Sequence, residues 1–151
     1  MHWLASHQGL EGLVASSAKF QTLTGTANAT AAKARVYFGG APSNAVRPLA
    51  YITVEGGNVE HVTHGSQSGS LVLSIEVPAS TYTDSTSEED LSDFMSDIDT
   101  ILSQMEANSE ARTVNWNMVG LSSVVPPHLV AEQQDDPDAP YYAASFLIRW
   151  T

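Results

Sequence analysis

The sequence predicts an α+β fold, in which a single mixed or antiparallel sheet carries an N-terminal helix and a central acidic amphipathic helix packed on one face. Two observations lead to this expectation. Strand-like segments occur in runs between two helical segments instead of alternating with helices one by one. Those segments are apolar on one side only, which suits a sheet that is covered on one face. The 151 residues are expected to form a single domain, residues 1–151.

The first predicted element is a helix over residues 4–23. Its expected buried face repeats at helical spacing through Trp3, His7, Leu10, Val14 and Ser17. Gly9 and Gly12 weaken this helix, because each glycine costs about 1 kcal/mol relative to alanine. Gly25 is the expected stop after the helix.

Four β-prone segments follow, at 35–38, 49–55, 58–63 and 70–78. Gly56-Gly57 is a good two-residue hairpin turn, so residues 58–63 are expected to return beside 49–55. Residues 65–69 are expected to form a polar turn. Residues 70–78 alternate cleanly between apolar and polar side chains, which is typical of a half-buried strand.

The central helix is predicted over residues 88–106. One apolar stripe runs along it, formed by Leu91, Phe94, Met95, Ile98, Ile101, Leu102 and Met105. Ser87 is the expected N-cap, with Asp90 returning a hydrogen bond in a capping box. Most other positions are acidic or small, so this helix should present a strongly negative face to water or to a partner.

The C-terminal third is predicted to contain two strands, at 113–121 and 141–151, joined by a long connection. The connection covers residues 122–140 and contains Pro126 and Pro127. Connections of this length inside a compact domain are often functional or disordered.

Composition excludes several classes of function. There are 17 acidic residues against 6 basic ones, a formal charge of −11, which argues against gripping DNA and against an anionic membrane surface. We expect no membrane span, because no apolar run reaches about 20 residues. The first residues lack the features of a signal peptide. Cysteine is absent, so a cytosolic product without disulfides is expected.

No catalytic signature stands out. His61 and His64 point to opposite faces if they lie on a strand, so a metal site there is not expected. The segment Gly65-Ser66-Gln67-Ser68-Gly69 has glutamine where a nucleophile elbow needs serine. The acidic residues near Asp136 lack the glycine and the glutamate of a calcium-binding loop. We therefore expect no enzyme activity, no metal and no cofactor.

Several stretches together resemble the tail terminator (tail completion) proteins of tailed bacteriophages. They are Phe20-Gln21-Thr22-Leu23-Thr24-Gly25 with the alanine-rich run into Arg35-Val36-Tyr37, then Arg47-Pro48-Leu49-Ala50-Tyr51-Ile52, then Ser68 to Glu76, and the closing Phe146-Leu147-Ile148-Arg149-Trp150. Each motif is weak alone, and their order and spacing carry the resemblance over most of the chain. The long connection at 122–140 departs from the family pattern.

The resemblance implies a structural virion protein without catalytic residues. Family members form a ring, usually a homo-hexamer, on the head-proximal end of the tail tube. That ring stops tube polymerisation and joins the tail to the neck. The implied partners are other copies of the chain, the tail tube protein and a neck protein, and the implied location is the tail–neck junction of a virion assembled in the host cytoplasm. DNA would pass through the ring without sequence-specific binding.

Two alternatives remain open at this point. One is a head-closure or connector neck protein or another minor tail component, and the other is a small ligand-binding or hydrolytic domain. Within the ring reading, we expect the acidic helix face to line the DNA channel, although that face could equally serve only solubility. The channel-facing residues would be Glu89, Asp93, Asp97 and Asp99. The expected subunit or partner contacts are Arg35, Tyr37, Pro126, Pro127, Asp135 and Asp136.

Overall fold

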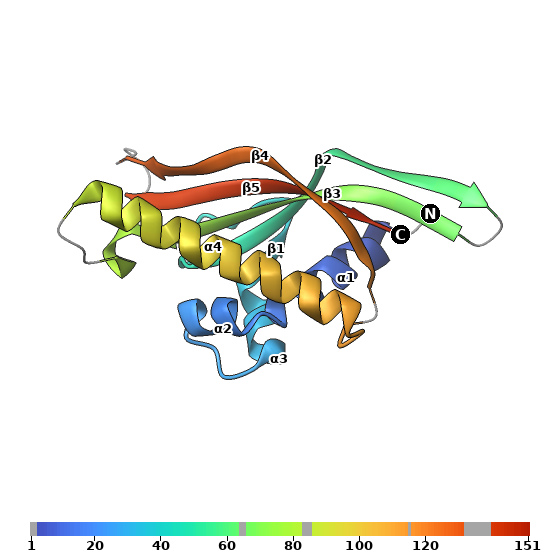
Figure 1. Ribbon diagram of the computed structural model, residues 1–151, viewed down its shortest axis with the longest axis horizontal. Coiled ribbons are helices and arrows are strands. Elements are labelled where there is room, and N and C mark those ends of the chain that lie inside the picture. Colours follow the sequence, from blue (N-terminus) through green and yellow to red (C-terminus); the bar gives the residue numbers. More distant parts are fainter. Residues whose placement is uncertain (1–2, 64–65, 83–85, 115, 132–139) are drawn as a thin grey trace.

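The protein is a five-stranded sheet with its helices packed on one face (Figure 1). The computed structural model describes residues 3–63, 66–82, 86–114, 116–131 and 140–151. The helices are α1 (Trp3–Ala15), α2 (Ala18–Thr24), α3 (Ala29–Ala32) and α4 (Ser87–Glu110), with short 3₁₀ turns η1 (Lys33–Arg35) and η2 (Ala79–Thr81). The strands are β1 (Val36–Phe38), β2 (Leu49–Thr63), β3 (Ser66–Pro78), β4 (Met118–Val130) and β5 (Tyr141–Trp150). The predicted α+β fold with an N-terminal helix is confirmed.

The sheet is mixed, with the strand order β1-β2-β3-β5-β4. Only β1 runs parallel to its neighbour, pairing Val36 with Ala50, and all other neighbours are antiparallel. Although β4 precedes β5 in the sequence, β5 lies between β3 and β4 in the sheet. Strand β4 therefore forms one edge of the sheet. The short strand β1 lies at the other edge.

The core lies between the sheet and the helices. Alternate residues of β3 and β5 face this layer, and they are fully or almost fully buried: Leu71, Leu73, Ile75, Val77, Tyr142, Ala144, Phe146 and Ile148. From α4 the same core receives five of the seven residues of the predicted apolar stripe: Phe94, Ile98, Ile101, Leu102 and Met105. Of the other two, Leu91 is partly buried against the core and Met95 is 41% exposed, so the prediction is wrong for Met95. Phe94 stacks on Tyr142, with 5.4 Å between ring centroids. The alternate apolar residues of β3 and β5 and the apolar stripe of α4 are buried against each other, and this burial holds the helices on one face of the sheet.

The predicted first helix is divided into two. α1 ends at Ala15, and Ser17 has an extended backbone (φ −67°, ψ 119°) that starts α2 in a new direction. The Ser17 hydroxyl accepts a hydrogen bond from the Phe20 N–H and donates one to Gln104 on α4 (2.7 Å). The predicted stop at Gly25 is confirmed, because Gly25 lies in the left-handed region at φ 67°.

The predicted hairpin at Gly56-Gly57 is wrong. β2 continues through both glycines to Thr63, and its partner is β3, with the register shifting between Thr53 and Asn58. Two adjacent glycines therefore accompany an irregularity within one long strand instead of a reversal. The polar turn expected at 65–69 is also wrong, since Ser66 to Gly69 belong to β3. Gly65 lies outside the described residues.

The start of α4 is one residue earlier than predicted. The N-cap is Thr86, whose hydroxyl accepts a hydrogen bond from the Glu89 N–H at 3.1 Å, and Ser87 is already the first helical residue. Thr86 and Ser87 are both good capping residues, so sequence alone does not choose between them. α4 also extends beyond the predicted end, to Glu110.

Most of the predicted long connection is a strand. β4 begins at Met118, later than the predicted start at Thr113, and extends to Val130 through Pro126 and Pro127. Proline lacks an N–H donor and is tolerated on an edge strand, which is where β4 lies. Residues 132–139 lie outside the described part of the chain, so nothing is concluded about Asp135 and Asp136.

Candidate functional site

The most highly charged surface of the described chain is the exposed side of α4. The helix carries 8 of the 17 acidic residues and no basic one: Glu88, Glu89, Asp90, Asp93, Asp97, Asp99, Glu106 and Glu110. Among the predicted channel residues, Glu89, Asp93 and Asp99 are exposed. The first-turn carboxylates also suit the positive end of the helix dipole. An exposed negative surface of this kind repels the phosphates of nucleic acid.

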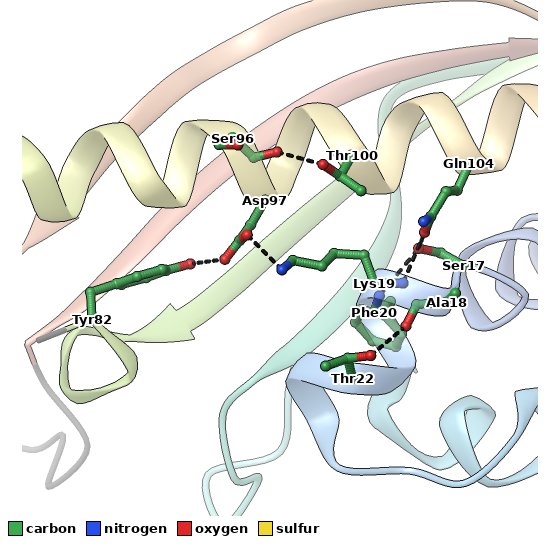
Figure 2. A network of polar contacts seen from close by, with 10 residues as sticks. All are labelled: Ser17, Ala18, Lys19, Phe20, Thr22, Tyr82, Ser96, Asp97, Thr100 and Gln104. Carbon is green, nitrogen blue, oxygen red and sulfur yellow. Dashed lines mark hydrogen bonds and ion pairs between the residues drawn. The ribbon is translucent and has the colours of Figure 1, made fainter.

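Asp97 differs from the other predicted channel residues, because it is held in a contact between α4 and the N-terminal helices (Figure 2). Its carboxylate forms an ion pair with Lys19 on α2 (2.9 Å) and accepts a hydrogen bond from the Tyr82 hydroxyl (2.8 Å). The Asp97 side chain is 16% exposed. On the same side of α4, the Gln104 side chain accepts hydrogen bonds from Ser17 and from the backbone N–H of Lys19. Asp97 therefore anchors α2 and does not belong to the open acidic face.

Burial raises the pKa of Tyr82, and the hydrogen bond to Asp97 and the nearby negative charges of Asp97 and Asp93 raise it further. A phenol with a raised folded-state pKa stabilises the fold fully below pH ~10, where an unfolded tyrosine begins to ionise. This stabilisation is lost as the pH rises above that value towards the folded-state pKa. Wild-type stability should therefore fall steeply above pH ~10.

Tyr82→Phe tests this dependence on pH. At about pH 8 we expect the variant to be less stable than wild type by about 1 kcal/mol, because the hydrogen bond to Asp97 is lost. The gap should narrow above pH ~10, because phenylalanine cannot ionise when the chain unfolds. Urea unfolding at several pH values from about 8 to 11 measures both quantities. If the difference in free energy of unfolding between wild type and Tyr82→Phe stayed constant over this pH range, the raised pKa of Tyr82 would be contradicted.

The edge formed by β4 carries exposed apolar side chains, which we call the β4-edge patch: Val119 (56% exposed), Val124 (53%), Val125 (39%) and Leu129 (46%). The pairing of β4 with β5 shifts register at three places, so the outer edge is irregular. With Pro126 exposed and Pro127 half-buried, this edge is poorly suited to adding another strand by backbone pairing. Contacts here would be made through side chains.

The opposite edge has a smaller apolar surface, the β1-edge patch of Phe38 (41% exposed) and Val54 (45%). Phe38 pairs with Ile52, two residues before Val54, so both side chains lie on the same side of neighbouring strands. The Phe38 ring also packs edge-on against His7 of α1, at 5.0 Å. Of the predicted contact residues here, Tyr37 is half-buried. Arg35 is turned inward, with its Nε buried and its Nη1 3.5 Å from the Thr24 carbonyl oxygen.

The distal parts of β2 and β3 extend beyond their outer neighbours. β1 pairs only with residues 50–52 of β2, and β5 ends its pairing with β3 at Gly69 opposite Trp150. The strands therefore continue as a two-stranded arm, which Figure 1 shows projecting from one end of the molecule. An isolated pair of strands is at best marginally stable in water. An arm of this kind is a further candidate for contact with another protein.

The candidate metal and nucleophile motifs of the sequence can be compared with the described residues. Among them, no group of three or more His, Cys, Asp or Glu side chains is placed to hold a metal ion. The side chain of His61 and the whole of His64 are outside what the structure describes. Ser66 and Ser68, from the segment compared with a nucleophile elbow, lie within β3. In the part of the chain that the structure describes, each helix is too short or too polar to span a membrane.

Sequence reasoning missed the β4-edge patch. The sequence predicts a connection over residues 122–140, which contains Pro126 and Pro127, where the structure has β4 as far as Val130. The paired valines Val124 and Val125 were the available signal for a strand. Comparison with known protein families and with curated proteins finds no match for this sequence.

Proposed function

We propose that the protein is a structural subunit that assembles with copies of itself into a closed ring, and that the ring is a tail terminator of a tailed bacteriophage. The observation that carries the proposal is the pair of unlike apolar patches on opposite edges of one sheet. A ring closes by head-to-tail contact between two different surfaces of each subunit. The β1-edge and β4-edge patches satisfy this requirement, because β1 and β4 are the outermost strands.

The chemistry of the two patches suits such a contact. Each contains bulky apolar side chains that are 39–56% exposed, and burying them against another copy would remove apolar surface from water. Neither patch contains a charged residue. Copies with a formal charge of −11 repel one another, so contacts away from the acidic α4 surface are the favourable ones.

The acidic face of α4 supports the same proposal. Glu89, Asp93 and Asp99 are exposed on it, and α4 carries no basic residue. A channel wall with this charge would let DNA slide without binding to the phosphates. We therefore keep the assignment of this face to the channel for Glu89, Asp93 and Asp99, and omit Asp97. A ring in which α4 lies on the outer wall would contradict this part of the proposal.

The resemblance of the sequence to tail terminator proteins is the reason for proposing a tail terminator in particular. The tail tube protein and a neck protein are its proposed further partners. The test is the morphology of particles assembled without this protein, seen by electron microscopy. Overlong tails are the expected result, because nothing would stop tube polymerisation. Tails of normal length beside heads that leak DNA would contradict the assignment and favour a neck protein. Normal, infectious particles would exclude both.

A further inference from the structure

The two outer edges of the sheet differ in how they are protected against pairing with another strand. An edge strand presents unpaired backbone N–H and C=O groups, and proteins usually interrupt such an edge with proline, a bulge or charged residues. β4 is interrupted in this way, because it contains Pro126 and Pro127 and its pairing with β5 shifts register at three places. On the other side of the sheet, beyond the short strand β1, the edge is formed by β2.

Residues 55–63 of β2, which we call the arm edge, have no strand neighbour on their outer side within the described ranges. β1 covers β2 only at residues 50–52. On the inner side, β2 pairs with β3 from Asn58 to Thr63, after a register shift that spans the two adjacent glycines. At about 3.3 Å per residue, the arm edge is about 30 Å long. Figure 1 shows the arm projecting beyond the helices at one end of the molecule.

The backbone of the arm edge is suited to adding another strand. Its sequence contains no proline and no lysine, the residues that most often block an edge. From Asn58 to His61, four successive residues pair with β3 without interruption, so the outer backbone groups of this stretch are regularly spaced. An extended segment of another chain can pair with such an edge through main-chain hydrogen bonds. Because a pair of strands is marginally stable alone, an added strand would also stabilise the arm.

The charge of the arm favours one class of added strand. Glu55 and Glu60 are the acidic residues of the arm edge, and the sequence has no lysine or arginine from Pro48 to Ala111. Two arms of this chain paired with each other would unite segments of like charge, which is unfavourable on adjacent strands. A strand that carries lysine or arginine would bring the opposite charge to the same place. The charge therefore disfavours a second copy as the occupant and favours a basic segment.

We propose that the arm edge binds an extended segment of another protein that contains lysine or arginine, and that this segment joins the sheet as a further strand. The outer backbone groups of β2 supply the hydrogen bonds, and the acidic residues of the arm edge supply the preference for a basic segment. The arm edge contains no residue of the β1-edge patch or the β4-edge patch. The proposal therefore goes beyond ring closure and does not depend on it.

The test uses the full chain and three labelled peptides of about ten residues. The lysine peptide alternates valine and threonine and carries three lysines. In the glutamate peptide each lysine is replaced by glutamate. The proline peptide keeps the lysines but has proline at two inner positions, so it has the same charge and cannot form a regular strand. Fluorescence anisotropy measures binding, and hydrogen exchange followed by mass spectrometry measures the protection of residues 55–63.

We expect saturable binding of the lysine peptide, about tenfold or more tighter than that of the other two peptides, with slower exchange at residues 55–63. Equal binding of the lysine and proline peptides would show attraction by charge without strand addition, and would overturn the proposal. Equal binding of the lysine and glutamate peptides would overturn the preference for a basic segment. Exchange that slows with protein concentration alone, without peptide, would assign the arm edge to a second copy instead. Unchanged exchange at residues 55–63 would also overturn the proposal.

A pair of double variants separates the arm edge from the net charge of the chain. Glu55→Lys/Glu60→Lys should weaken binding of the lysine peptide by about tenfold or more. Glu106→Lys/Glu110→Lys makes the same change in net charge at two exposed positions of α4 and should leave binding unchanged. Equal losses in both variants would contradict a site on the arm. The peptide series on the wild-type chain is made on the unassembled protein, so it stands whether or not these variants fold and whether or not the ring forms.

Discussion

Replacing Arg47 by alanine is expected to lower the free energy of unfolding by about 3–5 kcal/mol. Arg47 Nε lies 3.0 Å from Glu76 Oε1, and the two side chains are only 11% and 10% exposed. The Arg47 guanidinium also stacks on the Tyr141 ring, 3.6 Å from its centroid. One side chain from the segment before β2 thus joins β3 and β5 on the face of the sheet that carries no helix. Without Arg47, the Glu76 carboxylate would remain buried without its cation.

The control for this prediction is the double variant Arg47→Met/Glu76→Leu. Removing both charges leaves no unpaired buried ion, so most of the lost stability should return. Denaturant unfolding of wild type, Arg47→Met, Glu76→Leu and the double variant gives the coupling energy. If Arg47→Ala and Glu76→Leu each changed stability by less than about 0.5 kcal/mol, as ordinary surface substitutions do, the ion pair would not have the role assigned to it.

Gly9→Ala is expected to destabilise the protein by about 1–3 kcal/mol, although alanine is the better helix former. A Cβ at Gly9 would lie 2.2 Å from Cδ1 of Trp116, so the ring or α1 must move. The cost of overpacking exceeds the gain of about 1 kcal/mol in helix propensity. Tryptophan fluorescence should change together with stability, because Trp116 is the displaced group.

Gly12→Ala is the matched control on the same helix. A Cβ at Gly12 would be 3.4 Å from Val114 Cγ1, which is an ordinary contact. This variant should keep wild-type stability or gain up to about 1 kcal/mol. The sequence alone predicts equal effects at the two glycines. Equal measured effects would therefore contradict the packing of Trp116 against α1.

The fold could be predicted where one physical signal dominates. The apolar stripe of α4 and the apolar–polar alternation of β3 predict which side of each element is buried, and Gly25 predicts the end of a helix. The predictions failed where two local solutions have similar free energy. Gly56-Gly57 suits either a hairpin turn or an irregularity within a strand. Pro126-Pro127 suits a loop or an edge strand, and the outcome depends on where β4 lies in the sheet.

The candidate surfaces were less accessible to sequence reasoning, because exposure depends on tertiary packing. Asp93, Asp97 and Asp99 look alike in the sequence, yet only Asp97 meets Lys19 and Tyr82. A cavity beside Arg112 joins the end of α4 to the end of β5, and these segments are far apart in the chain. No local sequence pattern predicts that the end of α4 lies beside the end of β5.

Head-to-tail contact between the two edges of the sheet is the central claim, and site-directed cross-linking tests it most directly. The chain has no cysteine, so engineered cysteines would be the only thiols. We would place one in each patch, as Phe38→Cys and Val124→Cys, and treat the proposed phage particles, assembled with each variant, with a short thiol cross-linker. The double variant should give a ladder of covalent oligomers that ends at one closed species, while neither single variant cross-links to itself. Covalent dimers from a single variant, or assembled virions in which the double variant stays monomeric, would contradict the claim.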